Sequence, residues 1–152
     1  MANSIGNESP AHSPELARLV AFFETIDAAA CARIDSIYAE DACFKDPFNE
    51  VQGTAAIRRI FEHMFVQVAD PRFCVTCAVQ SGCEAFLAWD FRFRMRRFDR
   101  LTGQIIRGAS HVRFAADGRV AQHRDYWDAA EELYEKLPVV GTLMRWLKRQ
   151  AG

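Results

Sequence analysis

Asp46 is the first residue whose setting suits proton-transfer chemistry. It follows Phe44 at strand spacing and precedes Pro47 and Phe48, so its surroundings are expected to be rigid and apolar. In such surroundings desolvation moves a carboxyl pKa towards neutrality, where the group can act as a base. The alternative is structural, because an Asp-Pro pair often begins a turn, and local sequence alone favours the turn. Both interpretations of Asp46 stay open.

A second group with chemical potential lies on the last strand-like segment. Side chains alternate along a strand, so His123, Asp125 and Trp127 share one face and their even-numbered neighbours share the other. The small Ala121 and the large Trp127 favour the odd-numbered face as the inner one. An imidazole, a carboxylate and an indole would then meet on a cavity wall. The alternative is a hydrogen-bonded His-Asp pair on a solvated face, which is the usual place for charged residues.

Several kinds of site are not indicated by the sequence. It contains no Gly-rich phosphate loop, nucleophile elbow, P-loop or paired-histidine metal motif. Its histidines are widely separated: His12, His63, His111 and His123. We therefore expect neither a metal nor a cofactor.

Residues 92–100 combine arginines with aromatic and apolar side chains, a texture also found on nucleic-acid surfaces. The period of two separates them, with the apolar residues pointing inwards and the arginines outwards. The net charge of −1 gives no global attraction to nucleic acid or to an anionic membrane. We expect no nucleic-acid or membrane partner, and a homodimer formed through the outer sheet face.

No apolar run approaches the length of a membrane span, and the first residues lack the features of a secretory leader. The expected location is the cytoplasm. Five cysteines are expected to be free, buried thiols, and Cys74 and Cys77 should point to opposite faces of a strand.

Two helical patterns lead the chain. The first begins at Ser13-Pro14-Glu15, where a cap, a first-turn proline and an acid follow one another. The second runs through Ile34, Ile37 and Tyr38 and is followed by a short strand over Ala42–Asp46. A third, strongly amphipathic helix opens at Gly53-Thr54.

From Arg72 onward the period changes to two, with turn signals that separate four long strands. The expected fold is α+β, with helices packed on a strongly curved, mainly antiparallel sheet around an apolar pocket. Residues 1–13 are expected to form a flexible tail, 14–130 a single domain, and 131–152 a C-terminal extension of two short helices that packs on it.

Two stretches of the chain resemble the NTF2-like superfamily, and within it the SnoaL-like group that includes steroid delta-isomerases and limonene epoxide hydrolases. The first stretch runs from Tyr38-Ala39-Glu40-Asp41-Ala42 through Asp46-Pro47 to Gly53-Thr54-Ala55-Ala56-Ile57-Arg58, and the second is His123-Arg124-Asp125-Tyr126-Trp127-Asp128. This resemblance implies the cone-shaped, cystatin-like form of the α+β fold.

Each stretch also implies a role for one carboxylate. The first is similar to the isomerase pattern, in which the residue at the position of Asp46 moves a proton between carbons. Phe22 and Ser110 occupy the positions of the two isomerase oxyanion donors. The second is similar to the epoxide hydrolase segment in which the residue at the position of Asp125 helps to activate water. The neighbouring strand carries Asp90-Phe91-Arg92, the reverse of that family's Arg-x-Asp order.

The sequence therefore suggests a cofactor-independent enzyme acting on an apolar small molecule, by isomerisation, epoxide opening or ring closure. Asp46 and Asp125 would be its acid and base, and His123 would tune one of them. The other site residues would contact substrate: Phe22, Phe44, Phe61, Ser110 and Trp127. The competing hypothesis is a non-catalytic domain that binds a small molecule in the same cone and dimerises through its sheet.

Overall fold

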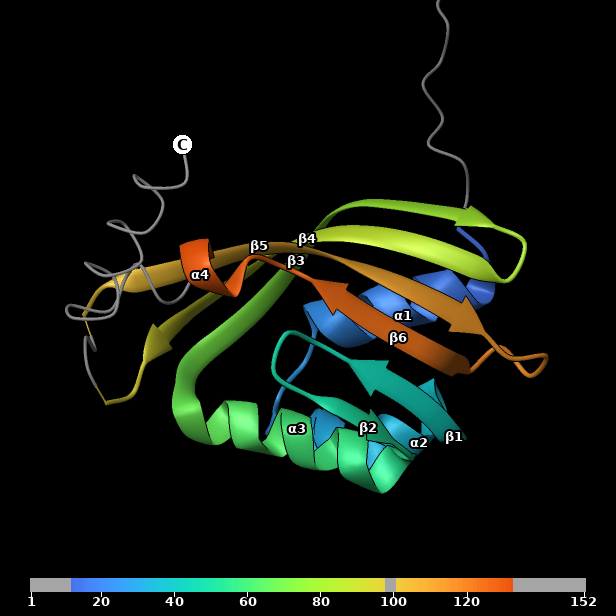
Figure 1. Cartoon of the computed structure of the whole chain (residues 1–152), viewed down its shortest axis with the longest axis horizontal. Helices are drawn as coiled ribbons and strands as arrows, with labels where there is room; N and C mark the ends of the chain where they lie inside the picture. Colours follow the sequence, from blue (N-terminus) through green and yellow to red (C-terminus); the bar gives the residue numbers. More distant parts are fainter. Residues whose placement is uncertain (1–11, 98–100, 133–152) are drawn as a thin grey trace, which may run out of the picture.

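The computed structural model describes residues 12–97 and 101–132 of the chain (Figure 1). Helices come first and the long strands follow, which confirms the predicted α+β class. The elements in chain order are α1 (Pro14–Glu24), the 3-10 helix η1 (Ala28–Arg33), α2 (Ile34–Ile37), β1 (Tyr38–Lys45), β2 (Glu50–Gln52), α3 (Thr54–Gln67), β3 (Val68–Ser81), β4 (Glu84–Met95), β5 (Gly103–Phe114), β6 (Val120–Tyr126) and α4 (Ala129–Glu132).

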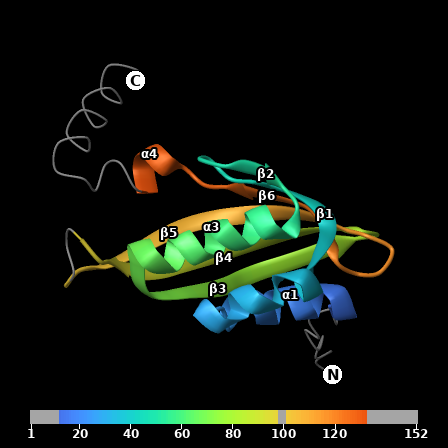
Figure 2. The ribbon, with the colours of Figure 1, turned by 90° about the horizontal axis from the view of Figure 1, so that it is seen from below.

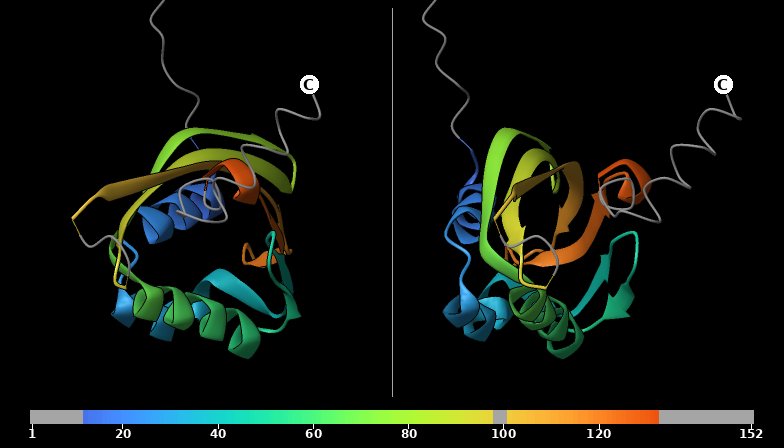
Figure 3. Two further views of the ribbon diagram at one scale, coloured as in Figure 1. Left: turned by 60° about the vertical axis from the view of Figure 1, so that its left-hand side comes forward. Right: turned by 90° about the vertical axis from the view of Figure 1, so that its left-hand side faces the viewer.

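The strands form one sheet in the order β2-β1-β6-β5-β4-β3. The meander from β3 to β6 is antiparallel, as predicted, and among the strand pairs of the described residues only β1–β6 is parallel. Helix α3 packs against β3 at one edge of the sheet and against β1 and β2 at the other. The sheet therefore curls until both edges reach the same helix, and Figures 2 and 3 show this strong curvature.

Helix α1 begins as the sequence predicts. The side chain of Ser13 accepts a hydrogen bond from the backbone N–H of Leu16 at 3.2 Å, and Pro14 occupies the first turn, where its missing N–H costs nothing. The inner face of the helix buries Leu16, Leu19, Phe22 and Phe23.

Gly53 connects the short strand β2 to helix α3. Its φ of 91° lies in the region that favours glycine, and its N–H donates to the carbonyl of Ala42 at 2.8 Å. The chain can therefore turn directly from the sheet edge into the amphipathic helix that was predicted to open at this point. Helix α3 presents Ile57 and Phe61 to the core.

Strand β1 is longer than the strand predicted over Ala42–Asp46, and Tyr38 belongs to it rather than to the preceding helix. The alternation of buried and exposed residues fails at its start, because Tyr38 and Ala39 are both buried and the next two residues are both exposed. The pairing with β6 shifts register between Tyr38 and Cys43. Because of this bulge, the first residues of β1 lack the two-residue alternation by which a strand is recognised in a sequence.

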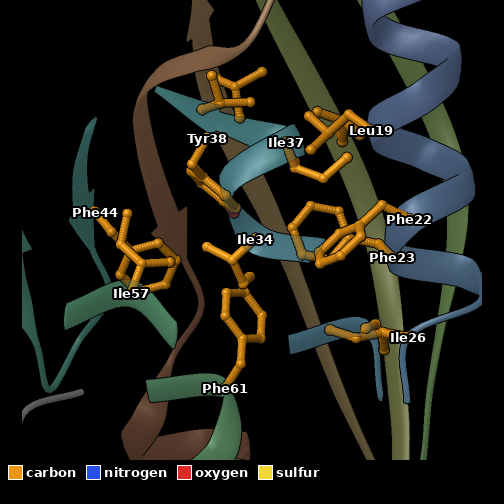
Figure 4. Packing of buried hydrophobic residues seen from close by; sticks show 14 of the residues in the cluster. Leu19, Phe22, Phe23, Ile26, Ile34, Ile37, Tyr38, Phe44, Ile57 and Phe61 are labelled. Carbon is orange, nitrogen blue, oxygen red and sulfur yellow. The ribbon is translucent and has the colours of Figure 1, made fainter. Parts of the chain in front are cut away.

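The core lies between the concave face of the sheet and the helices. Figure 4 shows side chains from α1, α2, β1 and α3 packed together, with Phe22, Phe23 and Phe61 among them. The Phe22 and Phe61 rings meet edge-on with centroids 6.4 Å apart. The inner surface around the site is therefore mostly aromatic.

The cysteine prediction is partly wrong. The five thiols are free, as expected, but only Cys31 is buried. Cys74 and Cys77 are both exposed, because β3 carries a register shift between Val75 and Cys77 that breaks the alternation between them.

Most of the predicted C-terminal extension lies outside the described residues, as does most of the N-terminal tail. Within the described part, a four-residue helix, α4, follows β6 close to the predicted start of the extension. None of the helices in the described residues is long and apolar enough to cross a membrane.

Candidate functional site

Asp125 is the centre of a hydrogen-bonded cluster on the inner face of the sheet. Its Oδ1 accepts from the hydroxyl of Ser110 at 2.5 Å and lies 2.7 Å from Nε2 of His123. Among the described residues, no hydrogen bond is made to Oδ2. One carboxylate oxygen is therefore held by two neighbours, and the other accepts no hydrogen bond from the described residues.

Tyr38 determines which nitrogen of His123 carries the proton. The Tyr38 hydroxyl lies 2.7 Å from Nδ1, and Tyr38 has no exposed surface. Burial raises the pKa of Tyr38 well above its usual 10.0, and the charge of Asp125 adds to this, so the phenol keeps its proton. A buried O–H needs an acceptor, and Nδ1 is the only partner the phenol has in the described structure. Tyr38 therefore donates to Nδ1, and a neutral His123 donates from Nε2 to Asp125.

Trp89 supports the other side of the carboxylate. Its indole N–H donates to the Ser110 hydroxyl oxygen at 2.9 Å, which leaves the Ser110 proton for Asp125. Trp89 can lie against the sheet because its cross-strand partner is Gly108, where a Cβ atom would approach ring atoms of Trp89 to 2.6 and 2.9 Å. Two chains of donors, one through Ser110 and one through His123, thus converge on Oδ1.

The strand register explains why these side chains meet. Ser110 pairs with Asp125 across β5 and β6, and Phe44 of β1 pairs with His123 on the other side. After Val120, which is buried, the odd-numbered residues of β6 point inwards, as predicted: His123 is 3% exposed, whereas Gln122 and Arg124 are exposed. The cluster therefore draws its members from four consecutive strands, β1, β6, β5 and β4.

A small hollow of about 30 Å³ lies beside this cluster. Its walls are largely aromatic, and the rings touch one another: Phe73 lies 5.5 Å from Trp89 and 5.6 Å from Phe23, centroid to centroid. The residues that line it are Phe23, Phe61, Phe73, Val75, Leu87, Trp89, Ser110 and Asp125. Side chains thus fill much of the interior, and the hollow is polar only on the side where Ser110 and Asp125 line it.

The residues predicted to form the walls are distributed unevenly around this hollow. Phe61 lines it, and Phe44 packs on the imidazole of His123 at 4.9 Å between ring centroids. Phe22 is a core residue of α1 that is not part of the lining. Trp127 is half-buried and meets Phe48 edge-on at 5.4 Å.

Asp46 has a turn role in the structure. Its Oδ1 accepts from the backbone N–H groups of Phe48 and Asn49 at 2.7 and 2.6 Å, and its carboxylate also accepts from the Asn49 side chain. Asp46 is not among the residues that line the hollow, and in the described residues no hydrogen bond or ion pair joins it to Asp125. The structure therefore agrees with the turn interpretation of Asp46 and does not bring the two predicted carboxylates together.

Sequence reasoning missed Tyr38 and Trp89 as members of the site. A signal for both existed, because a buried tyrosine or tryptophan usually finds a partner for its polar atom. Trp89 lies on the inner face of β4, which pairs with β5, the strand that carries Ser110. A hydrogen bond between the two side chains could therefore have been expected.

A larger concavity of about 280 Å³ lies mainly on the outer side of the sheet, over β1, β6 and β5. It contains charged side chains of both signs, including Lys45, Glu50, Arg113 and Arg124. His111, which also lines this concavity, stacks on Phe86 with the ring planes 2° apart. Residues 12–97 and 101–132 hold no group of three or more His, Cys, Asp or Glu side chains that could bind a metal.

Comparisons with known proteins identify the family. The model of the SnoaL-like domain family matches residues 19–123, a range that includes Tyr38, Trp89, Ser110 and His123 and ends two residues before Asp125. No protein of curated function matches the chain significantly.

Solved structures share the fold at low sequence identity. A protein of ketosteroid isomerase-like fold from Catenulispora acidiphila, in complex with trimethylamine, is 13% identical (TM-score 0.68, 81% of this chain and 92% of that chain). A proposed SnoaL-like polyketide cyclase from Shewanella putrefaciens is 15% identical (TM-score 0.67, 81% and 98%). AclR from Streptomyces galilaeus, a proposed hydroxylase, is 18% identical (TM-score 0.64, 90% and 94%). At these identities the likeness shows the NTF2-like fold alone.

Proposed function

The chain belongs to the SnoaL-like family, and we propose that it is a cofactor-independent enzyme in which Asp125 moves a proton on an apolar small molecule. One observation carries this proposal. Oδ1 of Asp125 is held by Ser110 and His123, whereas Oδ2 accepts no hydrogen bond from the described residues. A base needs a fixed orientation and a free lone pair, and this arrangement supplies both.

The neighbours of Asp125 suit that role. Two donors on one oxygen match the ionised, acceptor-only form of a carboxylate. The aromatic walls limit the access of water, which strengthens electrostatic interactions in the hollow. His123 does not have to give up a proton in the reaction, because its Nε2–H orients Asp125 while Nδ1 is held by Tyr38. His123 and Tyr38 are thus positioning residues.

A single carboxylate favours some reactions over others. In an isomerisation, Asp125 would take a proton from one carbon as the carbon–hydrogen bond breaks, and would return it to another carbon. In a ring closure, it would take the proton from the attacking carbon and return it to the oxygen that becomes a hydroxyl. Epoxide opening needs a held water and a second acid, and the turn role of Asp46 removes the other carboxylate that was predicted for the site. Of the three reaction classes, the first two therefore have the better support.

Exchange of substrate hydrogen with solvent tests this proposal. The full chain is incubated in D₂O with β,γ-unsaturated ketones, cyclisable diketones and epoxides, and products are followed by NMR and mass spectrometry. Asp125→Asn is expected to lower the rate of deuterium incorporation by about 10²–10⁴. Asp41→Asn, a change at an exposed residue of β1, is the matched control and should keep the wild-type rate. Equal rates in wild type and Asp125→Asn would remove Asp125 from the chemistry.

The second candidate function is small-molecule binding without turnover. Two features favour it. The hollow is small, and its side-chain donors, the Ser110 hydroxyl and the Trp89 N–H, already bond within the cluster and are not available to stabilise a reacting group. The trimethylamine bound by the Catenulispora acidiphila protein is consistent with such a role for a fold of this type. Saturable binding of a ligand that undergoes no exchange and no conversion would favour this second function.

We also propose that the chain forms a homodimer through the outer face of the sheet. This face carries exposed apolar side chains, with Phe86 52% and Tyr126 49% exposed, and also the exposed arginines Arg92 and Arg94 of β4. Large exposed aromatic residues on one sheet face are typical of an association surface.

A further inference from the structure

We propose that the hollow beside Asp125 selects a positively charged head group, such as a small protonated alkylamine, on the otherwise apolar molecule proposed above. The inference rests on the site proposed above, and it does not depend on whether Asp125 transfers a proton. Four features of the described residues support it.

The first feature is the charge of the cluster. Since Tyr38 donates its only hydroxyl proton to Nδ1, His123 carries a single proton, on Nε2, and is neutral. A doubly protonated His123 would donate to the Tyr38 oxygen instead and would leave the fully buried phenol proton without an acceptor. With Asp125 ionised, the cluster therefore carries one negative charge.

The second feature is that no basic side chain balances this charge. Among the described residues, only His123 lies within ion-pair distance of Asp125, and neither lysine nor arginine lines the hollow. The Asp125 side chain is 19% exposed, so water can screen it only in part. Carboxylates that are largely enclosed are normally paired with a cation, and the described residues supply none for Asp125.

The third feature is the aromatic wall. Phe23, Phe61, Phe73 and Trp89 surround the hollow, and the face of an aromatic ring is its electron-rich side. Such rings attract a cation when it is placed over them, and the attraction increases as the cation loses its water. Aliphatic walls of the same size would also exclude water, but they would not attract a cation.

The fourth feature is the lack of unused donors. The indole N–H of Trp89 donates to Ser110, and the hydroxyl of Ser110 donates to Asp125. The lining residues therefore present an acceptor, Oδ2, but no spare side-chain donor for a carbonyl or an anion. A protonated amine brings both its own N–H donors and the missing charge. In a substrate, the same charge would stabilise a neighbouring carbanion, which the site cannot do by hydrogen bonding.

The size of the hollow limits what can enter. A volume of about 30 Å³ gives room for roughly two water-sized groups, so it fits a small cationic head rather than a whole large ligand.

The experiment compares protonated n-propylamine with n-propanol, which has nearly the same shape and can also donate to Oδ2 but is neutral. The full, ¹⁵N-labelled chain is titrated at neutral pH and constant ionic strength, and the indole N–H signal of Trp89 is followed by NMR. The amine is expected to bind at least about tenfold more tightly than the alcohol. Asp125→Asn should abolish this preference, and Asp41→Asn should retain it.

Equal affinities for the amine and the alcohol in the wild type would overturn the inference, as would an amine preference that survives in Asp125→Asn. If Asp125→Asn does not fold, Phe73→Leu tests the wall instead. Loss of this ring should weaken amine binding about two- to fivefold and leave the alcohol unaffected, and an unchanged amine affinity would count against the inference. Deuterium exchange measures proton transfer independently of amine binding. Exchange without amine preference refutes only this inference, whereas amine preference with neither exchange nor product formation refutes only the proposed enzyme.

Discussion

The phenol oxygen of Tyr38 lies 2.7 Å from Nδ1 of His123, and the two rings are stacked with their planes 11° apart. On the far side of the imidazole, Nε2 lies 2.7 Å from Oδ1 of Asp125. A hydroxyl at the start of β1 thus determines, through one ring, which hydrogen faces the carboxylate on β6. Tyr38 holds this position because it is enclosed completely.

Tyr38→Phe removes this hydroxyl and keeps the ring. Nδ1 of His123 would lose its buried partner, so the free energy of unfolding is expected to fall by about 1–3 kcal/mol. The imidazole would also lose its fixed tautomer, which ¹⁵N chemical shifts of the ring report directly. Urea denaturation measures the stability change. Tyr126→Phe, at an exposed tyrosine of β6, is the control and should change stability by less than about 0.5 kcal/mol. An unaltered tautomer in Tyr38→Phe would contradict the proposed role.

The raised pKa of Tyr38 also predicts that the protein loses stability in alkali. Burial, with a contribution from the charge of Asp125, raises the pKa of Tyr38 well above its usual 10.0. The unfolded chain therefore releases this proton at a lower pH than the folded chain does. The contribution of Tyr38 to stability is complete below pH 10.0 and is lost as the pH rises towards the folded pKa.

Between these two pKa values the free energy of unfolding should fall by about 1.4 kcal/mol per pH unit from this residue alone. Urea denaturation of wild type and Tyr38→Phe at about pH 9 and about pH 11 isolates the effect, since other groups titrate in both proteins. The advantage of the wild type should shrink over this range. A constant difference would show that Tyr38 titrates normally.

Part of the site could be predicted from alternation alone. On β6, inward-facing His123 and Asp125 follow from period two and from the large Trp127 at the end of the strand. The placement of His123 and Asp125 needed only a regular strand, because in a regular strand the sequence position determines the face. Ser110 was predicted from the family resemblance instead, and the structure pairs it with Asp125 across β5 and β6.

The placement of Tyr38 and Asp46 depended on irregular backbone or on local hydrogen bonds, which the periodicity of the sequence does not show. The bulge in β1 broke the pattern that would have placed Tyr38 on the inner face of a strand. At Asp46, strand spacing predicted an inward carboxylate, yet two backbone N–H groups of the next residues satisfy it locally. Local sequence favours the turn at Asp46, whereas the family resemblance implies a catalytic role, and the structure agrees with the local signal.

Replacement of Asp46 should therefore affect the turn first. In Asp46→Ala, the N–H groups of Phe48 and Asn49 lose their acceptor, and the free energy of unfolding is expected to fall by about 1 kcal/mol. Asp46→Asn keeps one acceptor oxygen and should lose less. The turn also places Phe48 against Trp127, so tryptophan fluorescence should change in the alanine variant together with stability. Equal stability of wild type and Asp46→Ala would argue against the turn role.

The proposed dimer gives a prediction at the outer sheet face. Phe86→Glu places a charge where an apolar ring is half exposed, so it should convert a dimer into a monomer. Sedimentation equilibrium at micromolar concentration measures this change. Val66→Glu, at an exposed position of α3, should leave the association state as it is. A wild-type protein that is monomeric under these conditions would refute the dimer.

Gly108→Ala tests the support beneath Asp125 without changing any polar group of the cluster. A Cβ atom at this position would approach Cζ2 and Cζ3 of Trp89 to 2.6 and 2.9 Å, closer than carbon atoms normally come. Trp89 would have to move, and its hydrogen bond to Ser110 would lengthen or break. Overpacking of this kind is expected to cost about 1–3 kcal/mol of stability.

Gly103→Ala is the matched control for this variant. Gly103 lies on the same strand, β5, and no atom lies within 4 Å of the position its Cβ would take. Urea denaturation should therefore show little change in Gly103→Ala and a clear loss in Gly108→Ala. In Gly108→Ala alone, the indole N–H signal of Trp89 should shift, because its acceptor is displaced. If both variants kept that signal in place, the contact between Gly108 and Trp89 would not be what orients the Ser110 hydroxyl towards Asp125.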